Sequence, residues 1–272
     1  MYPANFFSLF PAFPRNQRIF VAMSFDSRFD MRWNNVLDPA VRDIQIDGLA
    51  LEPHRVDLTM SGDSILTEIL DQISQCQIFL ADITALDVLN GKSMRNPNVF
   101  YEIGLAHSVR LPEEVILFRS DKYELAFDIS NVRVHLYDPD NYPDKARKLV
   151  SSVIKSSLHE LDLRKHLAIR QAASKLDYES LIVLAEAQQG GGVTPPLRQT
   201  AGQILTAIAR MDAISRLLEL NALQTEFSRA ITEVSIHQTA VHRDSSGLGV
   251  SYKITPFGSA LLKSIKEGTA SS

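Results

Sequence analysis

The 272-residue sequence has a single cysteine, no long apolar run and no excess of positive charge. Cys76 alone excludes an internal disulfide framework and suits a reducing compartment. No apolar stretch reaches the roughly 18 residues that a membrane-spanning helix needs. Residues 1–14 lack a basic residue before their apolar part and so do not resemble a secretory signal. We therefore expect a cytoplasmic protein without a membrane partner.

Several chemical motifs are also missing. The chain contains no Gly-x-Gly-x-x-Gly, Walker or nucleophile-elbow sequence, and residues 190–192 follow a helical pattern, so they form a linker. His54, His107 and His135 are scattered, without a metal-ligand spacing that carboxylates support. The formal net charge of −4 gives no general attraction to nucleic acid. We accordingly predict no metal and no bound cofactor.

Short apolar strands alternate with amphipathic helices over the first half of the chain. Strands are predicted over residues 18–25, 49–52, 77–84, 114–119 and 132–137. Helices are predicted over residues 29–44, where Pro39 should kink or restart the helix, and over residues 63–74 and 96–107. Continuous apolar strands joined by helices predict an α/β fold, in which a parallel five-stranded sheet is doubly wound by helices.

Residues 96–107 form the most informative helix. Asn96 can cap it, and Pro97 suits its first position because no N–H is needed there. An apolar stripe should pack on the sheet, with Gly104 allowing close approach: Val99, Ile103 and Ala106. Asn98 and Glu102, four residues apart, share a different face. Glu102 is either an ordinary surface glutamate or an acid held at a strand-to-helix junction, where open α/β folds bind ligands.

A second acid precedes this helix. Residues 77–84 resemble a buried strand that ends in Asp82 and Thr84. Because consecutive parallel strands end at the same edge of a sheet, we expect the Asp82 and Glu102 carboxylates to meet there.

The last third of the chain has a different pattern. A connecting helix over residues 141–175, with a possible break near Leu161, leads to helical segments and then to alternating residues 229–242. A returning strand over residues 250–254 and a final helix complete a pattern that resembles a winged-helix domain. Residues 173–272 carry nine Lys and Arg against nine Asp and Glu, so homo-oligomer or protein contacts are favoured over nucleic acid. The predicted parts are residues 1–16, 17–140, 141–175 and 176–272.

Residues 17–138 resemble the nucleoside 2-deoxyribosyltransferase-like family, many of whose members are described as TIR-like nucleotide-binding proteins. The resemblance rests on these ordered segments: Phe20 to Phe25, Arg55 to Asp57, Ala81 to Thr84, Asn96 to His107 and Phe127 to Ile129. It implies a flavodoxin-like fold and cleavage or exchange of an N-glycosidic bond. An insertion over residues 85–95 departs from the family pattern and should border the pocket.

The resemblance also implies roles for single residues. Glu102 would be the catalytic carboxylate, and Asp82 would contact the sugar or assist the leaving base. Around them we expect the substrate-binding residues: Ser24, Phe25, Arg55, Asp57, Thr84, Asn98 and Tyr101.

The expected function is an N-glycosidase or N-glycosyltransferase acting on NAD or another nucleotide-like substrate. The combination with a winged helix resembles effectors of bacterial anti-phage defence, including some associated with retrons. Two alternatives stay open: a nucleotide-sensing module without catalysis, and a transcription regulator.

Overall fold

The structure is a computed structural model of the chain. It describes residues 8–13, 15–55, 65–89, 92–125, 129, 132–189, 204–229 and 248–270. Two compact units divide the chain, Met1–Leu163 and Arg164–Ser272. Their border falls inside helix α6 (Pro143–Ala173), which continues for 31 residues without the break that the sequence allowed near Leu161.

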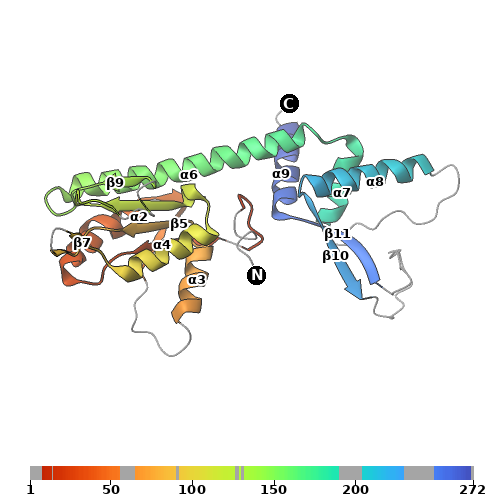
Figure 1. Cartoon of the computed structure of the whole chain (residues 1–272). Coiled ribbons are helices and arrows are strands. Elements are labelled where there is room, and N and C mark those ends of the chain that lie inside the picture. Colours follow the sequence, from red (N-terminus) through yellow and green to blue (C-terminus); the bar gives the residue numbers. More distant parts are fainter. Residues whose placement is uncertain are drawn as a thin grey trace. The chain divides into compact units, whose positions relative to one another are not determined.

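A five-stranded, all-parallel sheet forms the centre of the first unit (Figure 1). Its strands are β1 (Arg18–Ala22), β4 (Glu52–His54), β5 (Ile78–Asp82), β8 (Val115–Arg119) and β9 (Val134–Leu136). The order β4-β1-β5-β8-β9 places the first strand second, as in flavodoxin-type doubly wound folds. The predicted α/β fold and parallel sheet are therefore confirmed.

Helices cover both faces of this sheet. Successive side chains of a strand point to opposite faces, so each strand feeds two cores. Ile19, Leu80 and Phe118 belong to one core together with residues of α2 (Asp38–Arg42) and α6. Phe20 and Phe79 belong to the other core, with residues of α3 (Ile65–Gln75) and α4 (Pro97–Val109). We call these the α6 face and the α4 face (Figure 1).

The second strand of the sheet begins later than predicted. Residues 49–52 belong partly to a small hairpin of β2 (Gln45–Ile46) and β3 (Leu49–Ala50). Asp47 and Gly48 make its turn with φ angles of 51° and 80°, the positive values that a two-residue hairpin turn requires. The sheet strand is β4, which can include Pro53 because an edge strand leaves one row of N–H groups without a partner.

Pro39 disturbs the first helix as predicted. The segment consists of η2 (Ser27–Phe29), α1 (Asp30–Arg32), a π-helical turn η3 (Trp33–Leu37) and α2. Proline offers no N–H to the preceding turn, and its ring crowds the carbonyl four residues earlier. A widened π turn directly before Pro39 accommodates both effects.

The insertion over residues 85–95 contains a second hairpin, of β6 (Asp87–Leu89) and β7 (Lys92–Met94). A short turn, η4 (Pro112–Glu114), leads from α4 to β8. Cys76 is buried at the end of α3, and burial raises the pKa of its thiol, which makes it an unreactive core residue.

The second unit packs three helices with an antiparallel ribbon. The helices are α7 (Tyr178–Gln188), α8 (Ile204–Glu219) and α9 (Pro256–Ala270), and the ribbon pairs β10 (Leu223–Arg229) with β11 (Leu248–Ile254). The first strand thus begins before the predicted segment 229–242, most of which lies outside the described residues. Of the described helices, none is both long and apolar enough to cross a membrane.

Candidate functional site

Helix α4 begins as its sequence indicates. The Asn96 side chain accepts a hydrogen bond from the N–H of Asn98 at 2.9 Å, and Pro97 occupies the first helical position. Val99 and Ile103 are buried against the sheet. The expected role of Gly104 is wrong, because a Cβ atom built there meets nothing within 4 Å. The helix therefore docks through its apolar stripe alone.

Glu102 lies in the second turn of α4 and is partly buried. Among the described residues, no donor is hydrogen-bonded to its carboxylate. Asn98 and Tyr101, which the sequence suggested as its supports, are exposed and make no such bond. Burial raises the pKa of the Glu102 carboxyl from 4.5 to about 7. The Glu102 carboxyl therefore titrates closer to neutral pH than an ordinary glutamate.

The flank of α4 that carries Glu102 can be assigned from its neighbours. Phe100 lines a cavity of about 600 Å³ together with Tyr123 and Leu125, which follow β8. On a helix, Phe100 and Glu102 lie on opposite sides of Ile103, each displaced from it by about 60–100°. Glu102 therefore lies on the flank of α4 away from Phe100.

Asp82 has the opposite surroundings. Its side chain has no exposed surface. One carboxylate oxygen accepts the N–H and the hydroxyl of Thr84 at 2.9 and 2.5 Å. The other accepts the Tyr137 hydroxyl at 2.7 Å and, more distantly, the Arg32 guanidinium at 3.4 Å. Each oxygen of the carboxylate thus accepts from two protein donors, as a buried polar group requires.

The donors around Asp82 are themselves held. Arg32 donates to both carboxylate oxygens of Asp140, at 2.9 and 2.6 Å. Thr84 accepts the N–H of Ser120 at 3.0 Å. Burial, and then the Asp82 charge, raise the pKa of Tyr137 well above its ordinary value, so its hydroxyl stays a donor. We call this set of Asp82, Thr84, Tyr137, Arg32 and Asp140 the Asp82 network.

The two acids belong to different faces of the sheet. Asp82 follows Ile78 and Leu80 in alternation, and its partner Tyr137 belongs to the core of the α6 face. Glu102 is carried by a helix whose buried residues belong to the core of the α4 face. The neighbours of Asp82 and of Glu102 therefore belong to different cores, and among the described residues no hydrogen bond or ion pair joins the two carboxylates to a common partner.

Three of the predicted binding residues come together after β1. The Arg55 guanidinium donates to the backbone carbonyl of Ser24 at 2.9 Å and lies 4.1 Å from the centre of the Phe25 ring. Ser24 is buried, and its hydroxyl accepts the N–H of Asp26 at 3.2 Å, whereas half of the Phe25 surface is exposed. The Thr84 hydroxyl donates to Asp82 and so belongs to the Asp82 network. Asp57 lies outside the described residues.

Sequence reasoning missed Arg32, Tyr137 and Asp140. Arg32 lies in a helix after β1, and Tyr137 follows the last strand of the sheet. One signal was available for Tyr137, because a tyrosine directly after a parallel strand lies at the carboxyl-end edge. Nothing in the local sequence of Arg32 indicates that it pairs with acids 50 and 108 residues away.

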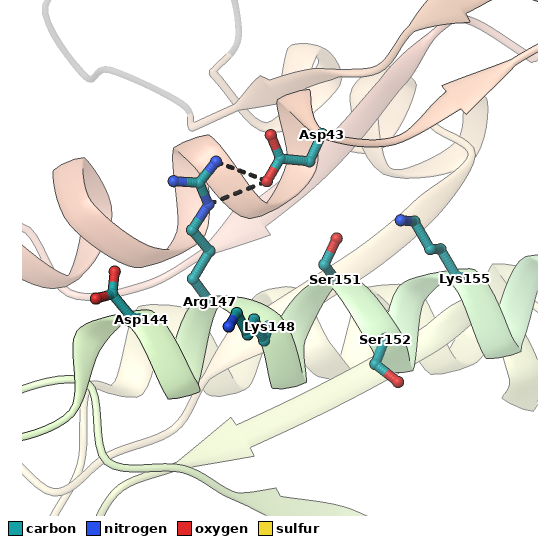
Figure 2. A pocket seen from close by; sticks show the side chains of 7 residues that line it. All are labelled: Asp43, Asp144, Arg147, Lys148, Ser151, Ser152 and Lys155. Atoms are coloured by element: carbon teal, nitrogen blue, oxygen red, sulfur yellow. Dashed lines mark hydrogen bonds and ion pairs between the residues drawn. The ribbon is translucent and has the colours of Figure 1, made fainter.

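A further cavity of about 730 Å³ lies beside α6 (Figure 2). There, Arg147 reaches Asp43 with two N–H groups, at 3.0 and 2.7 Å from one oxygen. Figure 2 shows Ser151 and Lys155 on the same side of the helix, whereas Ser152 points away. The arginine is thus already paired, and the described residues that line this cavity include no aromatic side chain and neither of the two acids discussed above.

Within the described part of the chain, no three His, Cys, Asp or Glu side chains gather closely enough to hold a metal ion. Comparison of the chain with the models of known protein families and with curated proteins finds no match.

Proposed function

We propose that the first unit is an N-glycosidase or N-glycosyltransferase for a nucleotide-like substrate, with Glu102 as its catalytic carboxylate. The observation that carries the proposal is the state of Glu102, which is partly buried and has no hydrogen-bond donor among the described residues. Strongly perturbed carboxyl groups in folded proteins occur preferentially at functional sites. The resemblance of residues 17–138 to nucleoside 2-deoxyribosyltransferase-like proteins supplies the class of reaction.

The chemistry follows from charge. When the bond between C1′ and a base nitrogen breaks, the bonding electrons leave with the base and the sugar becomes a cation like an oxocarbenium ion. An ionised Glu102 has little stabilisation in the free protein because burial has removed part of its water and none of the described residues donates to it instead. A positive charge forming at C1′ restores that stabilisation, so the transition state gains more than the ground state. Water then adds at C1′ and releases one proton to the solvent, or a second base adds through a ring nitrogen and releases the proton that this nitrogen carried.

Asp82 has a positioning role in this proposal. The Asp82 carboxylate is covered and cannot touch a substrate. It acts by fixing Thr84, whose hydroxyl in turn accepts the N–H of Ser120. Glu102 then acts without a second carboxylate. This arrangement suits a leaving base that already carries positive charge, such as the nicotinamide of NAD, because such a base needs no added proton.

The proposal is tested by incubating the purified protein with NAD and a panel of nucleosides and nucleotides, followed by mass spectrometry for free base. Glu102→Gln keeps the size of the side chain and removes its charge, so release should fall by about a hundredfold or more. Asp43→Asn, in the cavity of Figure 2, is the matched control and should release base at the wild-type rate. Equal rates for Glu102→Gln and wild type would remove Glu102 from the reaction.

We propose further that the second unit is a winged-helix-like module that contacts protein. Helix α8 directly precedes the ribbon, the position of a recognition helix. Its Arg210 is hydrogen-bonded to Glu186, and its Arg216 pairs with Asp177, so neither guanidinium is available to phosphates. Its exposed side chains include Leu205 and Ile208, which are apolar. These features favour a homo-oligomer or a protein partner over a transcription regulator.

A nucleotide-sensing module without catalysis is the alternative for the first unit. Calorimetric titration with NAD, combined with product analysis of the same sample, separates the two. Saturable binding with intact NAD afterwards favours sensing, and released nicotinamide favours the glycosidase.

A further inference from the structure

We propose that a second ligand site lies on the α6 face of the first unit and takes a small organic anion with an aromatic ring. The site is a cavity of about 520 Å³ between the ends of β8 and β9 and the start of α6. It is distinct from the surroundings of Glu102, which belong to the α4 face. The inference therefore goes beyond the proposed function and does not depend on it.

The back of this cavity is built from the Asp82 network. Tyr137 and Asp140 both line it, and Ser120, which also lines it, donates its N–H to Thr84. These groups are held by the hydrogen bonds to Asp82 and Arg32 already described. A ligand would thus meet a pre-organised wall at the carboxyl-end edge, where open α/β sheets bind their ligands.

The lining of the cavity holds two lysines that can receive an anion. Of the two acids in the lining, Asp140 is paired with Arg32, and Asp138 accepts hydrogen bonds at 3.0–3.1 Å from the backbone and side-chain N–H groups of Asn141, which stabilise its charge. These bonds from Asn141 lower the pKa of Asp138. Lys122 and Lys145 also line the cavity, and no carboxylate in the described part of the chain pairs with either. The two ammonium groups are therefore available to a phosphate or carboxylate.

The rest of the lining is apolar and uncovered. Tyr142 is 62% exposed, Leu136 51% and Leu149 36%, and all three border the cavity. An exposed tyrosine beside two aliphatic side chains offers a flat surface on which a planar ring can stack. A ligand that fits this lining has a planar ring to stack on the wall and an anionic group to meet the lysines. An aromatic phosphate or carboxylate has both features, and a nucleoside monophosphate is one example.

Isothermal titration calorimetry with AMP tests the site, using the Glu102→Gln protein so that no ligand is consumed. We expect saturable binding to one site, at least tenfold weaker with Lys145→Ala and with Tyr142→Ala. Lys145→Arg should retain it, since the charge remains. Lys148→Ala is the matched control: it removes a lysine less than one turn away that lines the cavity of Figure 2, and it should leave the affinity unchanged.

Each other outcome overturns part or all of the inference. An absence of AMP binding overturns the site. A loss with Lys148→Ala but not with Lys145→Ala places the anion in the cavity of Figure 2 instead. If inorganic phosphate binds as tightly as AMP, the inference that an aromatic ring stacks on the wall of the cavity is overturned. If the wild type shows no glycosidase activity but AMP binds as expected, the proposed function fails while this site stands.

Discussion

The α6 face and the α4 face of the sheet each hold one carboxylate near the carboxyl-end edge, in contrasting surroundings. Asp82 is covered and receives hydrogen bonds from Thr84, Tyr137 and Arg32. Glu102 is less deeply buried and receives none from the described residues. The donors, more than the depth of burial, decide what each acid can do. A buried carboxylate that accepts hydrogen bonds stabilises the folded state. A buried carboxylate without donors is poorly stabilised when ionised, so a cation beside it is bound favourably.

The largest effect on stability is expected when Asp82, the acid that accepts hydrogen bonds, is removed. Asp82→Ala leaves the Tyr137 hydroxyl and Thr84 without their acceptor, and Arg32 with only one acid. Breaking a buried ion pair in this way costs about 3–5 kcal/mol, measured as the free energy of unfolding in urea. Asp43→Ala is the control, because its pair with Arg147 is solvent-exposed and should contribute at most about 1 kcal/mol. Equal losses in the two variants would show that the Asp82 network stabilises the fold no more than an exposed ion pair does.

Glu102, the acid without a donor among the described residues, should make the free energy of unfolding depend on pH. The folded pKa of Glu102, about 7, exceeds its ordinary value of 4.5. Between these values the folded state binds more protons than the unfolded state, so stability falls as pH rises from about 4.5 to about 7. The change is at most about 3 kcal/mol, and residual contact with water makes it smaller.

Urea unfolding of wild type and Glu102→Gln at pH 5 and pH 8 measures this effect as a difference. The comparison is necessary because burial lowers the pKa of His54, His107 and His135, which gives stability the opposite pH dependence. We expect the glutamine variant to be the relatively more stable protein at pH 8. An identical pH response in both proteins would contradict the low hydration of Glu102.

Removing a single donor should have an intermediate effect. Tyr137→Phe deletes the 2.7 Å hydrogen bond to Asp82 and leaves the ring in place. We expect a loss of about 1–3 kcal/mol in the free energy of unfolding, because a buried charge loses a donor. Tyr142→Phe, at a mostly exposed position, should change stability by less than about 0.5 kcal/mol.

The smallest expected effect concerns the helix that carries Glu102. Gly104→Ala should stabilise the protein by about 0.5–1 kcal/mol, because alanine is the better helix former and its Cβ meets nothing. Gly258→Ala is the contrasting variant and should destabilise the protein, since its Cβ would overlap the carbonyl oxygen of Ala222. A thermal unfolding series of both variants checks the pair. Destabilisation by Gly104→Ala would mean that α4 packs more closely than described.

The sequence was a reliable guide where local rules decide the outcome. The Asn96 cap, the Pro97 start and the apolar stripe of α4 follow from short-range chemistry, and so does the parallel sheet. The surroundings of Asp82 depend instead on Arg32 and Tyr137, which lie 50 and 55 residues away along the chain. Alternation with Ile78 and Leu80 indicated which strand neighbours share its side, but which helices cover that side is a property of the assembled sheet. The two acids therefore looked like one site in the sequence.

The most direct test of the central contrast is a carboxyl titration by NMR. Protein labelled with ¹³C at glutamate side chains would be followed from pH 4 to pH 9, with the Glu102 signal assigned by its absence in Glu102→Gln. We predict a midpoint near 7 for this carboxyl. A midpoint between 4 and 5 would show that water or a donor stabilises the Glu102 charge, and the basis of the proposed catalysis would be lost.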